Sequence, residues 1–235
     1  MYTDFHTHIL PRLDDGAASK ETALQMLAAL ERQNVGRIVF TPHFYVDLVS
    51  VQDFLTKRRN AFSSINEQRF NEIDKKLGAE VYLVPGLSAL EGLELLCIEN
   101  TDYLLVELPY KKITPQTIQE IESISSGKGL HILLAHIDRY FKFITPEELT
   151  EVFGCCEVVY QVNTECFKDS LKRKGVFELM GYGVPVVLGT DAHNTTTRPP
   201  DFGSAVKAIE KEYGGRYLQR ISDCSDAIFA SAIAL

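Results

Sequence analysis

The chain has 235 residues, of which 45% are hydrophobic and 24% are charged. Together with a mean hydropathy of −0.05, these proportions are ordinary for a globular protein that buries a full core. The formal net charge of −8 argues against broad electrostatic binding to nucleic acid or to an anionic membrane. No charged leader precedes an apolar run, and no stretch approaches about 18 apolar residues, so we expect a cytoplasmic chain without a membrane span.

The cysteines give no sign of a disulfide framework or of a cysteine nucleophile. There are five, an odd number, and none forms a C-x-x-C pair: Cys97, Cys155, Cys156, Cys166 and Cys224. A cysteine phosphatase loop needs an arginine after five intervening residues, whereas six separate Cys166 from Arg173 and no glycine-rich loop lies between them. We therefore expect reduced, structural cysteines and no thiolate chemistry.

Seven short apolar segments have the character of β-strands. They span residues 2–8, 37–40, 79–84, 102–108, 131–136 and 158–162, and a last segment runs from Val184 to Asp191 and His193. Between them lie segments with helical spacing, at residues 20–33, 51–77 (one or two helices), 87–97, 115–125, 146–153 and 170–180. Ser19 is the expected N-cap of the first helix and Gly36 its stop.

The alternation of strands and helices predicts a parallel sheet. Parallel strands are joined by right-handed crossovers, so the pattern fits either a barrel or an open doubly wound sheet. Two further helices, at 203–213 and 223–234, carry no chemical signal, and no repeat or linker divides the chain. We expect a single α/β domain over residues 1–235, whose functional site lies beyond the carboxyl ends of the strands.

The segment Asp4–Gly16, D-F-H-T-H-I-L-P-R-L-D-D-G, opens the chain with two histidines and three carboxylates. Alternate residues of a strand point to the same face, so His6 and His8 can share a metal ion. An H-x-H pair alone is weak, because two polar residues on a solvated strand face give the same pattern. The interpretation depends on ligands from the rest of the chain.

Those ligands occur at the ends of other predicted strands. Five of the six histidines lie there, as do two carboxylates: His6, His8, His43, His136, His193, Glu107 and Asp191. With Asp15 and Glu80, the set exceeds what one ion accepts, which indicates two or three ions. Nitrogen and oxygen ligands without thiolate favour manganese, iron or zinc over calcium, and the natural chemistry is hydrolysis by a hydroxide that bridges the ions. His131 opens its strand and is expected to be structural.

Two arginines follow the ligand histidines closely. Arg139 and Arg198 lie three and five residues beyond His136 and His193. They can therefore reach the carboxyl ends of the strands, where a guanidinium can donate hydrogen bonds to phosphate oxygens. A solvated surface arginine is the alternative for each. Lys111 and Lys112 are interpreted as a solvated loop.

These motifs carry a family resemblance. The opening segment, T-P-H, G-A-E-V-Y, L-L-V-E-L-P, A-H-I-D-R-Y, and G-T-D-A-H-N with R-P-P resemble, in order and spacing, the PHP (polymerase and histidinol phosphatase) superfamily. The resemblance spans Asp4 to Pro200. It is strongest to the bacterial capsule-type, metal-dependent tyrosine-protein phosphatases (CpsB/CapC/YwqE-like).

The resemblance implies a distorted (β/α)7 barrel with a trinuclear metal site, in which manganese is the predicted ion and iron or zinc are alternatives. The first ion is expected on His6, His8, Glu80 and Asp191, the second on Glu80, Glu107 and His136, and the third on Asp15, His43 and His193. Asp14 can replace Asp15. Arg139 and Arg198 are expected to hold the phosphoryl group. Ile137-Asp138 and Phe44 depart from residues common in the family, which affects the expected substrate pocket and none of the ligands.

The implied activity is hydrolysis of phosphotyrosine on the tail of a membrane-associated tyrosine autokinase of capsule or exopolysaccharide biosynthesis. A phosphatase of the same superfamily acting on histidinol phosphate or a sugar phosphate is the first alternative. The second is a metal-stabilised regulatory or binding protein without catalysis. The sequence leaves open the native metal, the exact substrate, the oligomeric state and any general acid.

Overall fold

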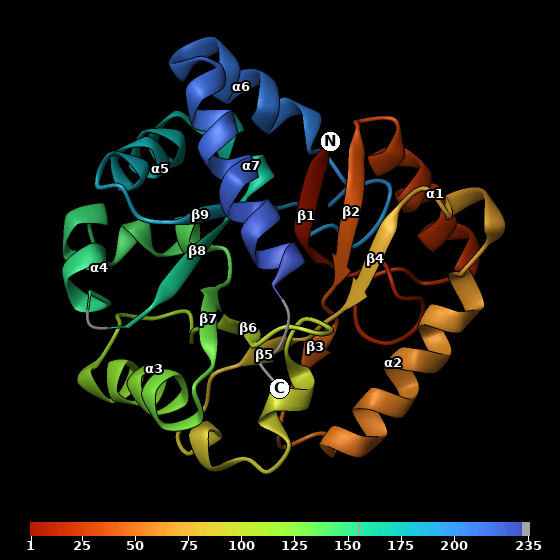
Figure 1. The fold of residues 1–235 in the computed structure, drawn as a ribbon, viewed down its shortest axis with the longest axis horizontal. Helices are drawn as coiled ribbons and strands as arrows, with labels where there is room; N and C mark the ends of the chain where they lie inside the picture. Colours follow the sequence, from red (N-terminus) through yellow and green to blue (C-terminus); the bar gives the residue numbers. More distant parts are fainter. Residues whose placement is uncertain (155, 232–235) are drawn as a thin grey trace.

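The computed structural model describes residues 1–154 and 156–231. Its strands are β1 (Tyr2–Thr7), β2 (Val35–Phe40), β3 (His43–Phe44), β4 (Asp74–Leu77), β5 (Glu80–Tyr82), β6 (Tyr103–Glu107), β7 (His131–Leu134), β8 (Val158–Asn163) and β9 (Val186–Gly189). Its α-helices are α1 (Lys20–Glu31), α2 (Val51–Ile65), α3 (Pro115–Lys128), α4 (Pro146–Val152), α5 (Ser170–Gly181), α6 (Gly203–Tyr213) and α7 (Gly215–Ala230). Most of these helices surround the strands (Figure 1).

The strands form a distorted (β/α)7 barrel. Every pair is parallel, in two sheets of order β1-β2-β4 and β3-β5-β6-β7-β8-β9. The sheets share chain segments, because β2 continues through Thr41-Pro42 into β3, and β4 continues through Gly78-Ala79 into β5. Beyond β9, Asp191 N donates to His6 O (2.8 Å) and His8 N donates to Ala192 O (3.0 Å), which connects the last strand segment to the first. The fold class predicted from the sequence is confirmed.

Local capping explains why several helices begin where the sequence predicts. The Ser19 hydroxyl accepts a hydrogen bond from Thr22 N at the start of α1. Thr145 and Glu148 form a reciprocal capping box at the start of α4. Pro115 and Pro146 occupy the first turns of α3 and α4, where a missing N–H costs nothing.

The prediction of helix up to residue 77 was wrong, because strand β4 lacks the apolar pattern by which a strand is recognised in a sequence. Residues 51–77 were expected to be helical, but α2 ends at Ile65 and β4 spans Asp74–Leu77, paired with β2. The D-K-K-L sequence of β4 contains a single apolar residue. Its strand conformation therefore comes from tertiary pairing, which local propensity does not reveal.

Two further corrections concern backbone conformation. Residues 87–97 form short 3₁₀ helices, Leu87–Ala89 and Leu93–Leu96, because Gly92 between them is in the left-handed region (φ 79°) and interrupts a continuous helix. The stop after α1 is Asn34 (φ 63°) rather than Gly36, which lies inside β2. A Cβ on Gly36 would lie 1.9 Å from Met1 Sδ, so the glycine accommodates the N-terminal side chain.

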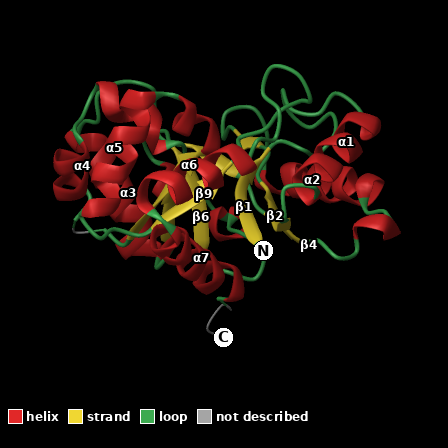
Figure 2. Ribbon diagram, turned by 90° about the horizontal axis from the view of Figure 1, so that it is seen from above, coloured by secondary structure: helices red, strands yellow, loops and turns green. Residues whose placement is uncertain are grey.

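Of the two C-terminal helices, α7 packs against β1 and β9, and α6 packs against α7 and the 3₁₀ helix Thr164–Lys168 after β8. Helix α6 matches its predicted range, whereas α7 begins at Gly215 instead of residue 223. Its apolar residues Ile221 and Ile228 are buried, and Figure 2 shows α7 near the N terminus, where β1 begins. The predicted helical residues 232–234 lie outside the described residues.

The larger hydrophobic core cluster includes residues from Ile9 to Ile221, and a smaller cluster contains barrel residues such as Phe5, Leu133 and Val187. We propose that the chain is one domain, because this larger cluster joins the first strand segment to the last helix. Among the described helices, none combines the length and apolar character needed to cross a membrane.

Gly189 allows the last strand to approach the first closely. A Cβ at this position would lie 2.5 Å from His6 Cβ and 2.7 Å from Gln161 Nε2. Both of those side chains are fully buried, so neither can move into solvent. The barrel therefore needs a residue without a side chain here.

We expect Gly189→Ala to lower the free energy of unfolding by about 1–3 kcal/mol, because the added methyl group overpacks a buried contact. Chemical denaturation monitored by circular dichroism measures the change. Gly181→Ala at the end of α5 is the matched control, since a Cβ there meets nothing within 4 Å. Equal stability of the two variants would contradict the close approach at Gly189.

Candidate metal centre

The nine predicted ligands come together at the carboxyl ends of the strands. They are contributed by β1 and the loop after it, by β3, β5 and β6, and by the segments after β7 and β9: His6, His8, Asp15, His43, Glu80, Glu107, His136, Asp191 and His193. Parallel strands bring their carboxyl ends to one edge, which explains how residues 185 positions apart, such as His6 and Asp191, meet. Three overlapping groups within this set have ligand atoms within 4.8 Å of one another.

Glu80 lies at the centre of the cluster. Its Oε2 is 3.2 Å from His6 Nε2, 3.3 Å from His8 Nε2 and 2.8 Å from His43 Nδ1. On the other side, Oε1 is 2.9 Å from His136 Nε2. A single buried carboxylate therefore contacts four imidazoles from three strand segments.

Around Glu80 lie the residues expected at the first two ion sites, although the ligand groups there are His6, His8 and Glu80, and His43, Glu80 and Glu107. Asp191 Oδ1 is 3.7 Å from His6 Nε2 and 3.4 Å from His8 Nε2, so it borders the first group. Glu107 Oε1 is 3.4 Å from His136 Nε2 in the second. His43 can also form a ligand group with Glu80 and Glu107, which makes it an additional neighbour of the second site.

A third ligand group involves Asp15, His43, His193 and His8. Asp15 Oδ1 is 3.3 Å from His43 Nε2 and 3.2 Å from His193 Nε2. Asp14 instead accepts from His8 Nδ1 (2.7 Å) and from the backbone N–H of His43 (3.0 Å). The two adjacent aspartates therefore have different surroundings, and only Asp15 belongs to this ligand group.

Both predicted arginines reach the edge of the cluster. Arg139 donates to Asp191 Oδ2, and Arg198 Nη2 lies 2.7 Å from Asp191 Oδ1. Each guanidinium is partly exposed, at 29% and 37% of its side chain, whereas Asp191 is buried. The exposed residues Lys111 and Lys112 lie in the loop after β6.

Two of the nine residues have strained backbones. His136 (φ 34°) and Asp191 (φ 51°) are in the left-handed region, which residues with a Cβ rarely occupy. Such conformations cost about 1–3 kcal/mol each and persist where the surrounding structure fixes them. Both lie immediately past a strand, so the strain occurs where the chain turns these side chains into the cluster.

The donor set fits divalent metal ions. Three buried atoms of the cluster have no hydrogen-bond partner among the described residues: Glu80 Oε2, His136 Nδ1 and His193 Nε2. Buried polar atoms are normally satisfied, whereas Glu80 Oε2 and His193 Nε2 lie 2.8–3.3 Å from other ligand atoms without a hydrogen bond, an arrangement that a shared ion would satisfy. Imidazole and carboxylate ligands suit first-row transition metals.

The protonation of Glu80 and His193 agrees with this fit, whereas neighbouring carboxylates outweigh burial and raise the pKa of His8, His43 and His136. Burial opposes ionisation of Glu80, yet the neighbouring histidines His6, His136 and His43 hold its pKa well below the usual value. Burial and the adjacent His8 lower the pKa of His193 to about 4, so its imidazole is neutral at pH 7. An ionised carboxylate and a neutral imidazole are the forms that bind metals.

A network of residues behind the ligands did not emerge from the sequence. Gln161 Oε1 accepts from His6 Nδ1 (2.9 Å) and from the backbone N–H of His136 (2.7 Å). Gln161 Nε2 donates to Asn163 Oδ1, and Asn163 Nδ2 donates to Asp191 Oδ2 (3.0 Å). The available signal was two amides at alternate positions of an otherwise apolar strand, the same spacing as His6 and His8.

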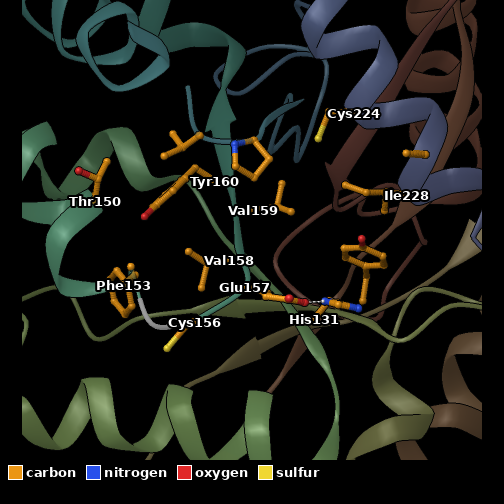
Figure 3. A pocket seen from close by; sticks show the side chains of 15 residues that line it. His131, Thr150, Phe153, Cys156, Glu157, Val158, Val159, Tyr160, Cys224 and Ile228 are labelled. Carbon is orange, nitrogen blue, oxygen red and sulfur yellow. Dashed lines mark ion pairs between the residues drawn. The ribbon is translucent and has the colours of Figure 1, made fainter. Parts of the chain in front are cut away.

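His131 lies far from these ligands, at the amino-terminal end of β7. It stacks on Tyr103 and its Nδ1 is 3.2 Å from Glu157 Oε2, beside a cavity of about 430 Å³ formed by strand starts and α7 (Figure 3).

Cys166 is buried, and burial raises the pKa of its thiol, which disfavours the thiolate. Cys155 lies outside the described residues.

Comparisons with solved structures identify the fold. One matching structure is described as belonging to the crystal structures of YwqE from Bacillus subtilis and CpsB from Streptococcus pneumoniae, unique metal-dependent tyrosine phosphatases. It matches with a TM-score of 0.84 and 19% identity, over 99% of this chain and 96% of the matched chain. Histidinol phosphate phosphatase from Lactococcus lactis, in complex with zinc, L-histidinol and phosphate, matches with a TM-score of 0.59 and 15% identity, over 95% and 93% of the two chains. At these identities the likeness establishes the shared fold.

Sequence comparisons identify the family. The tyrosine-protein phosphatase CpsB of Streptococcus pneumoniae is 27% identical over 224 residues, which cover 91% of each chain. The tyrosine-protein phosphatase YwqE of Bacillus subtilis is 25% identical over 227 residues, covering 90% of this chain and 85% of the relative. The family described as capsular polysaccharide synthesis, CpsB/CapC, matches residues 2–228. The chain therefore belongs to the CpsB/CapC family.

Proposed function

We propose that this chain is a metal-dependent protein-tyrosine phosphatase that acts on a tyrosine autokinase of capsule or exopolysaccharide biosynthesis. The observation that carries the proposal is the buried Glu80 carboxylate, surrounded by imidazoles, with Arg139 and Arg198 at the edge of the same cluster. Family membership and the names of the relatives support the substrate class.

The proposed site holds two to three ions, with manganese as the proposed metal. His6, His8, Glu80 and Asp191 would hold the first, Glu80, Glu107 and His136 the second, and Asp15, His43 and His193 the third. Bound ions would supply charge stabilisation for phosphate oxygens and an activated water nucleophile at neutral pH. Asp14 would orient His8, because its contact to Nδ1 leaves Nε2 directed at Glu80 and Asp191.

In this proposal the two arginines bind and orient the phosphoryl group. A guanidinium presents parallel N–H donors that match two phosphate oxygens, and both groups are exposed enough to reach a substrate. Tyrosine has a pKa of about 10, so a phenolate leaves more easily than an alkoxide and demands less of a general acid. This chemistry favours an aryl ester over histidinol phosphate.

A protein substrate is compatible with how the cluster meets solvent. The central ligands are buried, but the side chain of Asp15 is 66% exposed and lies at the outer edge. A phosphotyrosine on a flexible tail can therefore approach from that edge. We propose the phosphotyrosine tail of a membrane-associated kinase as the partner and the cytoplasm as the place of reaction.

The proposal is tested by phosphate release from a phosphotyrosyl peptide and from histidinol phosphate, side by side. Protein stripped with a chelator should be inactive, and added manganese should restore activity that prefers the peptide. His136→Ala should abolish that activity, because it removes a ligand beside both Glu80 and Glu107. Turnover of histidinol phosphate alone would move the function to a small-molecule phosphatase, and no release from either would refute a phosphatase.

We expect Arg139→Ala and Arg198→Ala each to lower kcat/KM for the peptide by roughly 10–100-fold, because hydrogen bonds from a charged group contribute about 1.5–3 kcal/mol. Arg216→Ala, an exposed arginine of α7, is the control and should keep wild-type kinetics. Metal content is measured in parallel. Full activity in both site variants would rule out phosphoryl binding by these arginines.

Gln161→Leu should weaken metal binding by about 10–100-fold, because the acceptor that orients His6 and fixes the backbone of His136 is lost. Competition titration against a chromophoric chelator measures the affinity without any assay of activity. Gln119→Leu, on the exposed side of α3, is the control. A lower melting temperature with unchanged metal affinity would show that Gln161 only stabilises the fold.

A further inference from the structure

A pocket of about 450 Å³ opens directly beside the third ligand group. Its inner end is formed by Asp14, Asp15 and His43, and the rest of its lining is mostly apolar: Leu13, Tyr45, Leu48, Val49, Phe54 and Lys57. Asp15 and His43 thus belong both to the ligand cluster and to the pocket. The pocket therefore borders the place where a molecule bound at the ligands would lie.

Tyr45 forms an aromatic wall at the inner end of this pocket. Its ring centroid is 5.5 Å from that of His43 and 5.7 Å from that of Tyr82, with tilted geometry in both cases. Tyr82 is paired in register with Glu107, so the Tyr45 ring lies beside the second ligand group as well as the third. The Tyr45 ring is therefore placed to contact the part of a substrate that extends outward from the ligand cluster.

The outer wall is apolar and exposed. Leu48 is 79% exposed although it is a large aliphatic residue, and Val49 and Leu13 lie in the same lining. Phe54 of α2 is buried and forms the floor, held by an edge-to-face contact with Phe44 (ring centroids 5.2 Å apart). Exposed apolar surface next to a few convergent polar groups is typical of a ligand site, and here it favours an apolar group attached to a phosphate.

We propose that this aryl pocket, formed by Leu13, Tyr45, Leu48, Val49 and Phe54, binds the phenyl ring of the substrate and selects aryl over alkyl phosphate monoesters. The inference rests on the proposed function, which places the phosphate at the ligand cluster. In phosphotyrosine only one oxygen atom separates the ring from the phosphorus. The ring of a bound ester must therefore lie beside the ligands, where this pocket begins.

Binding of two phosphonates to the manganese-loaded protein tests the pocket without any catalytic step. Phenylphosphonate and methylphosphonate share the anionic group and differ in the ring. Burying part of a phenyl ring corresponds to roughly a tenfold gain in affinity. We therefore expect the wild-type protein to bind phenylphosphonate about tenfold more tightly than methylphosphonate, measured by isothermal titration calorimetry.

Leu48→Asp and Tyr45→Ala are the test variants, and the ratio of the two dissociation constants is the readout. Each change should bring the ratio toward one, because a wall of the pocket becomes polar or is removed. Leu171→Asp on α5 is the matched control, since Leu171 is 80% exposed and lies outside the pocket. It should keep the wild-type ratio, and circular dichroism verifies that all three variants are folded.

The outcomes separate the pocket from the proposed function. The aryl pocket is overturned if the ratio of the two dissociation constants is near one in the wild-type protein. It is also overturned if the ratio stays at tenfold in both test variants. Either result holds even where the phosphotyrosyl peptide is hydrolysed. A tenfold ratio that the variants abolish, in a protein that leaves the peptide intact, supports the aryl pocket and refutes the protein phosphatase. If neither phosphonate binds, the aryl pocket and the proposed function are both overturned, because no phosphate site then exists beside the pocket.

Discussion

The buried carboxylate of Glu80 is the constraint on which the rest of the site depends. A carboxylate removed from water costs several kcal/mol unless charges or donors of opposite sign surround it. Here imidazole nitrogens of His6, His8 and His43 lie within 3.3 Å of one oxygen, and His136 lies beside the other. Because these histidines come from three separate strand segments, the carboxylate is stable only when the barrel is assembled around it.

The barrel meets this requirement with a few local devices. Parallel strands bring their carboxyl ends together, Gly189 removes the side chain that would separate β9 from His6, and positive φ angles turn His136 and Asp191 inward. Strand β8 contributes no residue of the predicted ligand set. Instead, its Gln161 and Asn163 hold His6, His136 and Asp191 from behind. Backbone strain and buried polar groups are thus concentrated at the cluster, as is typical of functional sites.

Much of this arrangement was predictable because its signals are local in sequence. His6 and His8 alternate on one strand, and His43, His136 and His193 each follow an apolar segment, so the parallel topology alone brings them together. Strand β4 was missed because its polar sequence pairs only through the tertiary structure. Asp14 and Asp15 are adjacent, and only folded geometry separates a partner of His8 Nδ1 from a neighbour of His193. Gln161 was missed because an amide within a strand has no motif of its own.

The same geometry explains how an acidic protein can recognise an anion. A net charge of −8 repels phosphate at long range, but screening confines that effect to about 10 Å at ordinary ionic strength. Within that distance, the proposed function assigns recognition to the ions that the ligand set would hold and to Arg139 and Arg198. These groups would bind the phosphate of any ester in the same way, so they cannot distinguish one phosphate ester from another. Discrimination must come from the surface next to the ligands, and there the chain places Tyr45, Leu48 and Val49 beside His43. In this proposal, charge provides affinity for the phosphate, and the apolar wall selects the group that is attached to the phosphate.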